Sequence, residues 1–258
     1  MPSAGRFQSS RFELKYIITE SYARAIRDFA LSYLEPDPHA DPARNCEYAV
    51  HSLYLDSRDL FLCRQTREGH KNRFKLRIRF YDDLPDSPAF LEIKRRQNDV
   101  ILKQRARVRR TAATRILNGH WPPAGDILTS TQDGLAAVED FCRLRSLLEA
   151  SGTVFVSYMR EAYVTPNDNT VRVTFDRRLY GTLYQGHGTL VRQGRVARPD
   201  VGGVILEIKF TDRFPAWLGH LARAFNLTRI SMPKYVVCVT ALSAPAPDIH
   251  HALAAAGE

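Results

Sequence analysis

Apolar and polar residues alternate one by one along several short stretches of the chain. In residues 73–81, a cation occupies every odd position up to Arg79, and an apolar residue occupies every even position. A period of two is typical of a β-strand, whose successive side chains point to opposite faces. The pattern returns over residues 102–109. The sequence therefore predicts two strands that each have one apolar face and one basic face.

Further stretches show the same alternation or are rich in β-branched residues, and they predict more strands. These stretches are 11–16, 47–55, 90–94, 153–162, 171–176, 206–210 and 234–242. Charge falls on one face in most of them; Glu207 and Lys209, for example, alternate with apolar residues. The charged faces can form the solvated side of an open antiparallel sheet, or they can line the inside of a closed barrel.

Apolar residues recur at spacings of three and four in other parts of the chain, as in amphipathic helices. We expect helices over 20–34 and 132–150, one that begins at Pro215, and short ones near 57–67 and 112–117. Thr19 is suited to cap the first of them. Their apolar stripes predict that these helices cover the apolar side of the sheet, so the expected fold class is α+β.

The composition is that of a globular protein. The chain has 258 residues, of which 44% are hydrophobic and 25% charged. Because we find neither an internal repeat nor a linker, we expect one domain over residues 1–243 and a flexible tail over 244–258. The N-terminus has no apolar secretory signal, and no stretch approaches 18 apolar residues. Four cysteines without a CxxC pair favour a reducing compartment, so we expect a cytoplasmic protein.

Positive charge is concentrated in one segment. The chain has 37 Lys and Arg against 28 Asp and Glu, which gives a net charge of +9. Residues 73–115 alone contain 13 Lys and Arg and five Asp and Glu, and thus a net charge of +8. Neighbouring strands with like charges repel unless anions or acidic residues lie between them. The segment therefore predicts an anionic partner.

Several common catalytic motifs are absent from the sequence. It has no P-loop, no G-x-G-x-x-G fingerprint, no G-x-S-x-G elbow and no H-E-x-x-H zinc motif. A nucleic-acid binder would more often expose its cations beside aromatic stacking platforms. Here Phe74 and Phe80 fall on the apolar face, so we expect no nucleic-acid partner. The remaining prediction is that side chains on strands bind a polyanion.

Eight short segments together resemble a known family. They are residues 12–16, 52–56, 75–79, 91–94, 158–160, 172–176, 206–209 and 234–235, and they occur in this order. The set is similar to the polyphosphate polymerase domain of the vacuolar transporter chaperone (VTC) complex, one of the triphosphate tunnel metalloenzymes related to the CYTH proteins. The similarity spans roughly residues 6–242. It implies about eight antiparallel strands that close into a β-barrel flanked by helices, with a basic tunnel inside.

The resemblance also implies roles for individual residues. The implied catalytic cations, which hold phosphates, are Lys15, Arg77, Arg79, Lys94, Arg160 and Arg172. The implied substrate-binding residues are Lys75, Lys103, Arg105, Tyr158, Lys209 and Lys234. Glu207, together with Glu92 and Glu13, is implied as the ligand of a divalent metal ion, Mn²⁺ or Mg²⁺.

The implied activity is transfer of the γ-phosphoryl group of ATP to a growing polyphosphate chain. Phosphoryl transfer depends mainly on positioning and charge neutralisation, and an anionic polyphosphate end needs no general base. CYTH hydrolases begin with E-x-E-x-K, whereas Arg11 stands here at the first Glu, which favours synthesis over hydrolysis. Pro233 stands where the VTC pattern has a serine, so one hydroxyl ligand is missing.

Two alternatives remain at this point. The first is a metal-dependent tripolyphosphatase or nucleoside triphosphatase on the same fold, and the second is a polyanion-binding module without catalysis. The implied partners are ATP and polyphosphate or triphosphate. A membrane-protein partner is left open, because the membrane spans and the regulatory domain of the eukaryotic protein have no counterpart in this sequence. The resemblance therefore implies a stand-alone bacterial relative.

Overall fold

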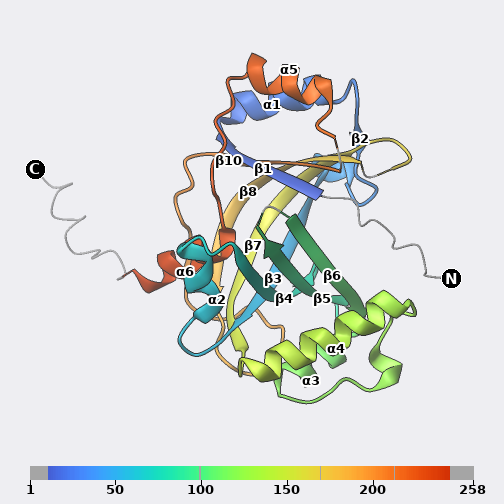
Figure 1. The fold of residues 1–258 in the computed structure, drawn as a ribbon, viewed down its shortest axis with the longest axis vertical. Helices are drawn as coiled ribbons and strands as arrows, with labels where there is room; N and C mark the ends of the chain where they lie inside the picture. Colours follow the sequence, from blue (N-terminus) through green and yellow to red (C-terminus); the bar gives the residue numbers. More distant parts are fainter. Residues whose placement is uncertain (1–10, 99, 169, 212, 245–258) are drawn as a thin grey trace, which may run out of the picture.

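The computed structural model describes residues 11–98, 100–168, 170–211 and 213–244 (Figure 1). Its strands are β1 (Arg11–Ile18), β2 (Glu35–Pro36), β3 (Glu47–Asp56), β4 (Asn72–Phe80), β5 (Ala89–Gln97), β6 (Val100–Val108), β7 (Ser151–Val164), β8 (Val171–Leu183), β9 (Val196–Ala197) and β10 (Val204–Thr211). They form one antiparallel sheet in the order β1-β10-β8-β7-β3-β4-β5-β6, and the two-residue strands β2 and β9 pair with β7 and β8. The antiparallel sheet is as predicted.

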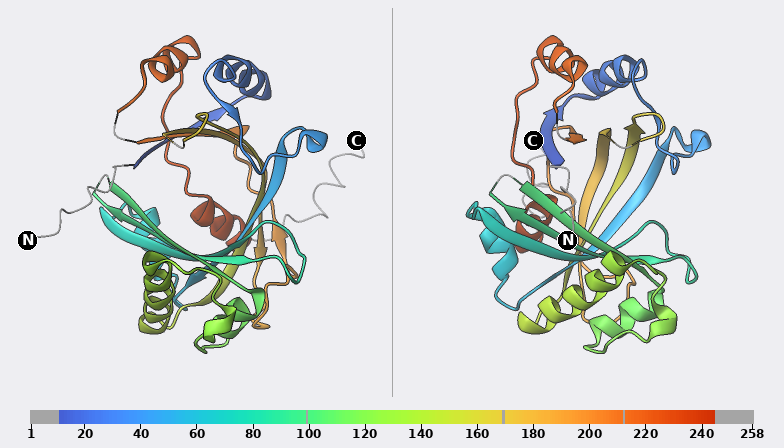
Figure 2. Two further views of the ribbon diagram at one scale, coloured as in Figure 1. Left: turned by 90° about the vertical axis from the view of Figure 1, so that its right-hand side faces the viewer. Right: turned by 45° about the vertical axis from the view of Figure 1, so that its right-hand side comes forward.

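The sheet is strongly curved but does not close, so the prediction of a closed barrel is wrong. β1 and β6 stand at the two ends of the hydrogen-bonded order, and no ladder joins them within the described residues (Figure 2). The two edges nevertheless approach each other. An ion pair of 2.7 Å between Lys94 Nζ and Glu13 Oε2 connects β1 to β5, the neighbour of β6. Alternation shows which face of a strand is buried, but it does not show whether the first and last strands pair.

Strand register brings the charged positions together on the concave face of the sheet. Arg77 of β4 lies opposite Tyr54 of β3 and Glu92 of β5, and Lys15 of β1 lies opposite Glu207 of β10. The apolar residues of β4 at positions 76, 78 and 80 are fully buried. The prediction that these strands have one apolar and one charged face is therefore confirmed.

The helices are α1 (Glu20–Ala30), α2 (Phe61–Arg67), α3 (Arg110–Leu117), α4 (Gln132–Leu147), α5 (Ala216–Ala224) and α6 (Lys234–Ser243). Short 3₁₀ turns lie at Pro42–Arg44 and Ala124–Asp126. The Thr19 side chain accepts a hydrogen bond from the Tyr22 amide at 3.2 Å, which confirms the predicted cap of α1. α1 ends at Ala30, four residues before the predicted end, and α4 ends three residues early.

Helices cover the convex face of the sheet from two sides. α1 and α5 lie side by side over β1, β10 and β8, whereas α3 and α4 lie against β4, β5 and β6 (Figures 1 and 2). Phe141 of α4 and Ile116 of α3 pack with Ile78 and Leu91 in one apolar cluster. Burial of these side chains, each worth about 1.5–3 kcal/mol, stabilises the curved sheet.

The segment 234–242 was predicted to be a strand, but it forms helix α6. Its buried residues Tyr235, Val236, Cys238 and Leu242 follow a helical spacing, and they pack against concave-face residues near one end of the sheet. Packing outweighs the β propensity of the valines in this segment. Figure 2 shows α6 within the curve of the sheet.

One aromatic residue of α6 contacts both the sheet and the residue that binds the first turn of α2. The Tyr235 ring stacks on the ring of Tyr54 with centroids 4.5 Å apart. Its hydroxyl donates a hydrogen bond to Asp56 Oδ2 at 2.8 Å. Asp56 also accepts hydrogen bonds from the amides of Leu62 and Cys63 in α2. One buried carboxylate therefore anchors both α2 and α6.

Two predictions concern residues that the structure does not describe. Apart from Ala244, the predicted flexible tail over 244–258 lies outside the described residues, and so does the side chain of Arg11. Among the described residues, no helix is both long enough and apolar enough to span a bilayer.

Candidate functional site

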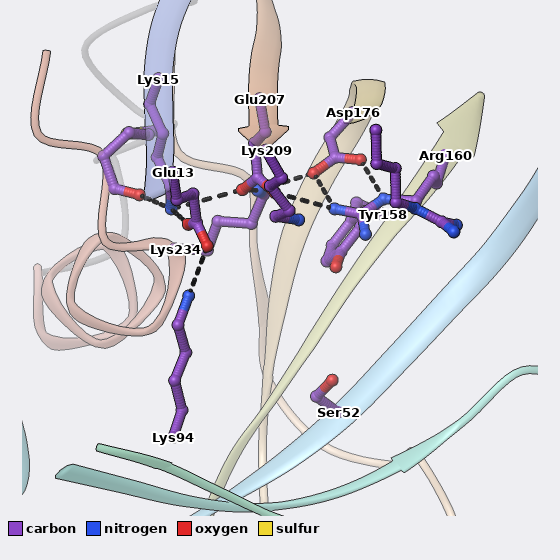
Figure 3. Close-up of polar contacts among 12 residues, drawn as sticks. Glu13, Lys15, Ser52, Lys94, Tyr158, Arg160, Asp176, Glu207, Lys209 and Lys234 are labelled. Carbon is purple, nitrogen blue, oxygen red and sulfur yellow. Dashed lines mark hydrogen bonds and ion pairs between the residues drawn. The ribbon is translucent and has the colours of Figure 1, made fainter. Parts of the chain in front are cut away.

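Charged side chains from five elements meet on the concave face. Figure 3 shows Lys15 of β1, Glu207 and Lys209 of β10, Asp176 of β8 and Arg160 of β7 pointing toward one another. Lys94 reaches this group from β5 on the opposite side. These residues are far apart in the sequence, and the register of the sheet brings them together.

Glu207 is the centre of the group. Its carboxylate accepts hydrogen bonds from Lys234 Nζ at 2.6 Å and Lys209 Nζ at 2.7 Å. It also forms ion pairs with Lys15 and Arg160, both at 3.3 Å. Burial raises the pKa of Glu207, but attraction to these four cations outweighs burial and holds the pKa well below its usual range. The buried carboxylate is therefore an anion at neutral pH.

A second buried carboxylate fixes the position of Arg160. Asp176 accepts two hydrogen bonds from the Arg160 guanidinium, both of 2.7 Å, in a bidentate arrangement. Lys234 Nζ forms an ion pair with the same carboxylate at 2.7 Å. Burial lowers the pKa of Lys234, but Asp176 and Glu207 together raise it above its ordinary value. The Tyr158 ring lies beside both cations, at 5.2 Å from Arg160 and 5.0 Å from Lys234.

Glu92 organises the cations of β4 and β6. It is fully buried and pairs with Arg77 at 2.6 Å, Lys103 at 2.7 Å, Arg105 at 3.4 Å and Arg79 at 3.8 Å. Burial raises its pKa, but these cations, Arg77 above all, hold the pKa well below the usual range. All four residues that pair with it are Lys or Arg, so Glu92 acts as their counter-ion in this structure.

Glu13 lies between two lysines and near a second carboxylate. Lys94 Nζ is 2.7 Å from Glu13 Oε2, and Lys15 Nζ is 3.2 Å from Glu13 Oε1. Because Lys15 also pairs with Glu207, its ammonium group bridges the two carboxylates. Burial raises the pKa of Glu13, but the two lysines outweigh burial and lower it.

Arg172 points to an acidic residue that the sequence analysis did not identify. Its Nη2 is 2.5 Å from the buried carboxylate of Asp37 and 3.1 Å from the hydroxyl of Tyr48. Asp176, which was also not predicted as a site residue, does lie in the segment 172–176 that carries the family resemblance. Asp37 lies in none of the eight segments that carry the family resemblance, and only the fold brings it next to Arg172.

Lys75 is the exception among the predicted cations. In the part of the chain that the structure describes, its ammonium group has neither a hydrogen-bond acceptor nor an ion-pair partner. Burial and the nearby cations, Lys15 first among them, lower its pKa well below the ordinary value. It lines a cavity of about 430 Å³ together with Lys15 and Lys94. The sequence analysis did not identify the other residues that line this cavity, among them Arg73, Arg95, Arg229 and Ser231.

Cations outnumber carboxylates on this face. The site predicted from the sequence includes eleven Lys and Arg, and the carboxylates that pair with them are Glu13, Asp37, Glu92, Asp176 and Glu207. This formal excess of six basic side chains in a partly buried space favours the binding of anions, and tri- or polyphosphate would supply them.

The carboxylates suit a metal ion that arrives with phosphate. No three acidic, histidine or cysteine side chains among the described residues gather closely enough to hold a metal by themselves. Glu13 and Glu207, however, share Lys15 and face the same space. Mg²⁺ and similar ions are commonly held by one or two carboxylates plus phosphate oxygens. This pair fits such an ion. Glu92, like Glu207, pairs with four cations, but among the described residues it shares none of them with a second carboxylate.

The sequence matches the family model of the VTC domain over residues 10–243. The chain belongs to the VTC domain family. This confirms the resemblance predicted from the eight segments, and the matched range includes every site residue from Glu13 to Lys234. No curated protein matches this VTC domain.

The comparison with solved structures finds similarity to three proteins that are each 13% identical to this chain in sequence. A candidate adenylate cyclase from Bacillus halodurans covers 87% of this chain and 95% of its own, with a TM-score of 0.48. The PH1819 protein from Pyrococcus horikoshii covers 89% and 98%, with a TM-score of 0.45. A candidate adenylate cyclase from Vibrio parahaemolyticus covers 91% and 98%, with a TM-score of 0.44.

Proposed function

We propose that this VTC domain is a metal-dependent polyphosphate polymerase, which transfers the γ-phosphoryl group of ATP to the end of a polyphosphate chain. Membership of the family supports an enzyme that acts on nucleotides or polyphosphate. The excess of cations on the concave face supports binding of several phosphates in a row. The choice between synthesis and hydrolysis depends on the carboxylates.

The observation that favours synthesis over hydrolysis is the lowered pKa of the buried carboxylates. Glu13, Glu92, Asp176 and Glu207 each pair with at least two cations, and the pKa of each is lowered despite burial. A general base works best when its pKa lies near the working pH, so these carboxylates are poor bases for activating water. A polyphosphate end is already anionic and attacks without a base. The site therefore favours transfer to phosphate over hydrolysis.

The cations can exchange carboxylate partners for phosphate oxygens. Arg77 and Arg160 are held by Glu92 and Asp176 with their guanidinium groups on the concave face. Each hydrogen bond to a charged group contributes about 1.5–3 kcal/mol, so a few of them bind a triphosphate tightly. Donors that are already in place need little reorganisation as charge develops during transfer. A divalent ion held by Glu13 and Glu207 would supply further charge neutralisation between phosphate oxygens.

Aromatic residues favour one end of the concave face for the nucleobase. Tyr81 directly follows β4 and Phe90 lies near the start of β5, so both are at the same end of this hairpin. The Arg105 guanidinium lies 3.8 Å from the centre of the Phe90 ring and donates a hydrogen bond to the Tyr81 hydroxyl. Aromatic and guanidinium planes are common stacking partners of bases. We therefore orient ATP with its base at this end.

Incubation of the purified protein with ATP and Mn²⁺, with separate assays of acid-labile polymer and orthophosphate, tests the proposal. We expect polymer and ADP to form together. Arg79→Gln removes a buried phosphate donor and is expected to lower chain formation about a hundredfold, whereas Arg115→Gln on α3 is a surface control with no effect. Release of orthophosphate alone would identify a triphosphatase. Binding of tripolyphosphate without turnover would identify a binding module.

A further inference from the structure

Tyr54 is a neutral residue in the middle of the charged concave face, and the sequence analysis assigned it no role. It belongs to β3, which lies between β7 and β4 in the order of the sheet. Arg77 of β4 lies directly opposite it. The neighbouring side chains in the concave row of β3, Val50 and Ser52, are neutral as well. Any side-chain hydrogen bond from this stretch of β3 to a phosphate therefore comes from a hydroxyl group.

Contacts on two sides fix the Tyr54 side chain. Its ring stacks on the ring of Tyr235 in α6, with centroids 4.5 Å apart and an angle of 8° between the planes. Its hydroxyl accepts a hydrogen bond from Arg77 Nη1 at 3.0 Å. Arg77 is in turn held by the carboxylate of Glu92 at 2.6 Å. The Tyr54 hydroxyl is therefore fixed beside a guanidinium group that we expect to bind phosphate.

The proton of the Tyr54 hydroxyl has no acceptor in the part of the chain that the structure describes. The hydrogen bond from Arg77 uses the oxygen as an acceptor, whereas a phenol also carries one O–H donor. The charged groups that act most strongly on this hydroxyl are Arg77, Arg79 and Lys94, and all three can only donate. Only 6% of the residue is exposed, and a buried donor without an acceptor is costly. The O–H group is therefore available to an acceptor oxygen of a bound anion.

We propose that the Tyr54 hydroxyl donates a hydrogen bond to the phosphate that Arg77 binds, which makes Tyr54 a further substrate-binding residue. The inference rests on the proposed function only in that phosphates of the substrate occupy the concave face. Arg77 binds the phosphate through its positive charge, and Tyr54 adds a neutral donor to the same phosphate. Because Arg77 also donates to the Tyr54 oxygen, the two hydrogen bonds form a chain in which each polarises the other.

The surrounding cations make Tyr54 a stronger donor. Burial raises the pKa of Tyr54, but the attraction of Arg77 and Arg79 outweighs burial, so the pKa lies below its ordinary value. A more acidic hydroxyl forms a stronger hydrogen bond to an anion. A bound phosphate is itself negatively charged and therefore favours the protonated form of Tyr54, which is the form that donates.

Binding measurements on the full chain test the role of Tyr54. Dissociation constants of tripolyphosphate at neutral pH are compared for the wild type, Tyr54→Phe and the control Tyr235→Phe. Both substitutions remove the hydroxyl of a buried tyrosine and keep the stacked rings, but the Tyr235 hydroxyl binds Asp56 instead of facing the cations. We expect Tyr54→Phe to weaken binding about tenfold or more, the effect of losing one hydrogen bond to a charged group. Tyr235→Phe changes the affinity less than about twofold.

A double-mutant cycle separates direct binding of phosphate from positioning of Arg77. If Tyr54 only held this guanidinium group in place, its hydroxyl would have no effect once Arg77 is replaced. In the Arg77→Gln background we expect Tyr54→Phe to weaken tripolyphosphate binding by a further factor of about five or more. Thermal melts of all variants establish that each is folded at the temperature of the binding measurement.

Two results would overturn this inference. They are an affinity of Tyr54→Phe equal to that of the wild type, and an effect of Tyr54→Phe that disappears in the Arg77→Gln background. Because binding is measured without turnover, the proposed function is decided separately. A wild type that releases only orthophosphate, with weakened binding in Tyr54→Phe, would refute the polymerase and keep Tyr54 as a phosphate-binding residue. Polymer formation by the wild type, with unchanged affinity in Tyr54→Phe, would refute the role of Tyr54 and keep the polymerase.

Discussion

Glu92 illustrates how a buried carboxylate can hold cations in place for a different anion. Four cations surround it, and none of its surface is exposed. A buried ion cluster of this kind contributes little net stability, because desolvation offsets the attraction, but removing one member leaves the others uncompensated. The free energy of unfolding of the protein therefore depends on which anion compensates the charge of these four cations.

Glu92→Gln is expected to lower the free energy of unfolding by about 3–5 kcal/mol, because Arg77, Arg79, Lys103 and Arg105 lose their counter-ion. Tripolyphosphate should recover much of this loss, since it binds only the folded state and supplies the missing charge. Denaturant unfolding with and without tripolyphosphate measures both effects. The exposed Glu139→Gln on α4 is the control. A Glu92→Gln variant as stable as the wild type would contradict the role of Glu92 as a counter-ion.

The pH dependence of anion binding is set by partly paired lysines. Burial lowers the pKa of Lys103 to about 7, although Glu92 opposes this effect. In the empty site Lys103 thus loses its proton as the pH rises above 7, whereas a bound polyanion restores the charged form. We expect binding of tripolyphosphate to take up protons above pH 7 and to weaken there relative to Lys103→Arg, which stays charged. Calorimetry in buffers of different ionisation enthalpy measures the proton uptake; equal uptake by both proteins would contradict this assignment.

The sequence predicted correctly to which face of the sheet a side chain points where the alternation along the strand alone decides this. The odd positions of β4 point to the concave face as the sequence predicted. Their partners were not predictable, because Asp37 and Asp176 reach Arg172 and Arg160 only through the register of strands distant in sequence. The cavity beside Lys75 escaped prediction for the same reason.

Among the elements, α6 and α2 depend on each other through Asp56. Tyr235→Phe removes the hydrogen bond to Asp56 and keeps the ring stacked on Tyr54. We expect the loss of one buried hydrogen bond to cost about 1–2 kcal/mol, which thermal or denaturant unfolding measures. Tyr33→Phe, on an exposed ring after α1, should change stability little. If Tyr235→Phe were as stable as Tyr33→Phe, the hydrogen bond to Asp56 would contribute nothing to the attachment of α6.

Whether a short apolar segment forms a strand or a helix is difficult to predict from sequence. The 234–242 segment is rich in valine and too short for periodicity to separate a strand from a buried helix. The long amphipathic helices α1 and α4 were predicted with small errors at their ends. Closure of the sheet was not predictable, because it depends on whether β1 and β6 pair, and neither strand's pattern contains this information.

In the molecule as a whole, the two sides of the concave face differ in charge. The side formed by β4, β5 and β6 lies within the basic segment recognised in the sequence, and Glu92 is its only carboxylate on the concave face among the described residues. The side formed by β1, β10 and β8 carries Glu13, Glu207 and Asp176. A divalent ion would therefore be held on the second side, between these carboxylates and phosphates that the first side binds.

Metal binding and phosphate binding should consequently strengthen each other. The empty site repels a divalent cation, because cations outnumber carboxylates and no cluster of three ligands exists among the described residues. We expect the protein alone to leave the electron paramagnetic resonance signal of free Mn²⁺ unchanged. Protein and tripolyphosphate together should reduce the signal more than tripolyphosphate does by itself, and by linkage Mn²⁺ should strengthen tripolyphosphate binding by the same factor. Glu207→Gln is expected to remove this additional effect, whereas Glu139→Gln on α4 should keep it. Tight binding of Mn²⁺ to the protein without phosphate would show that the carboxylates alone form the metal site.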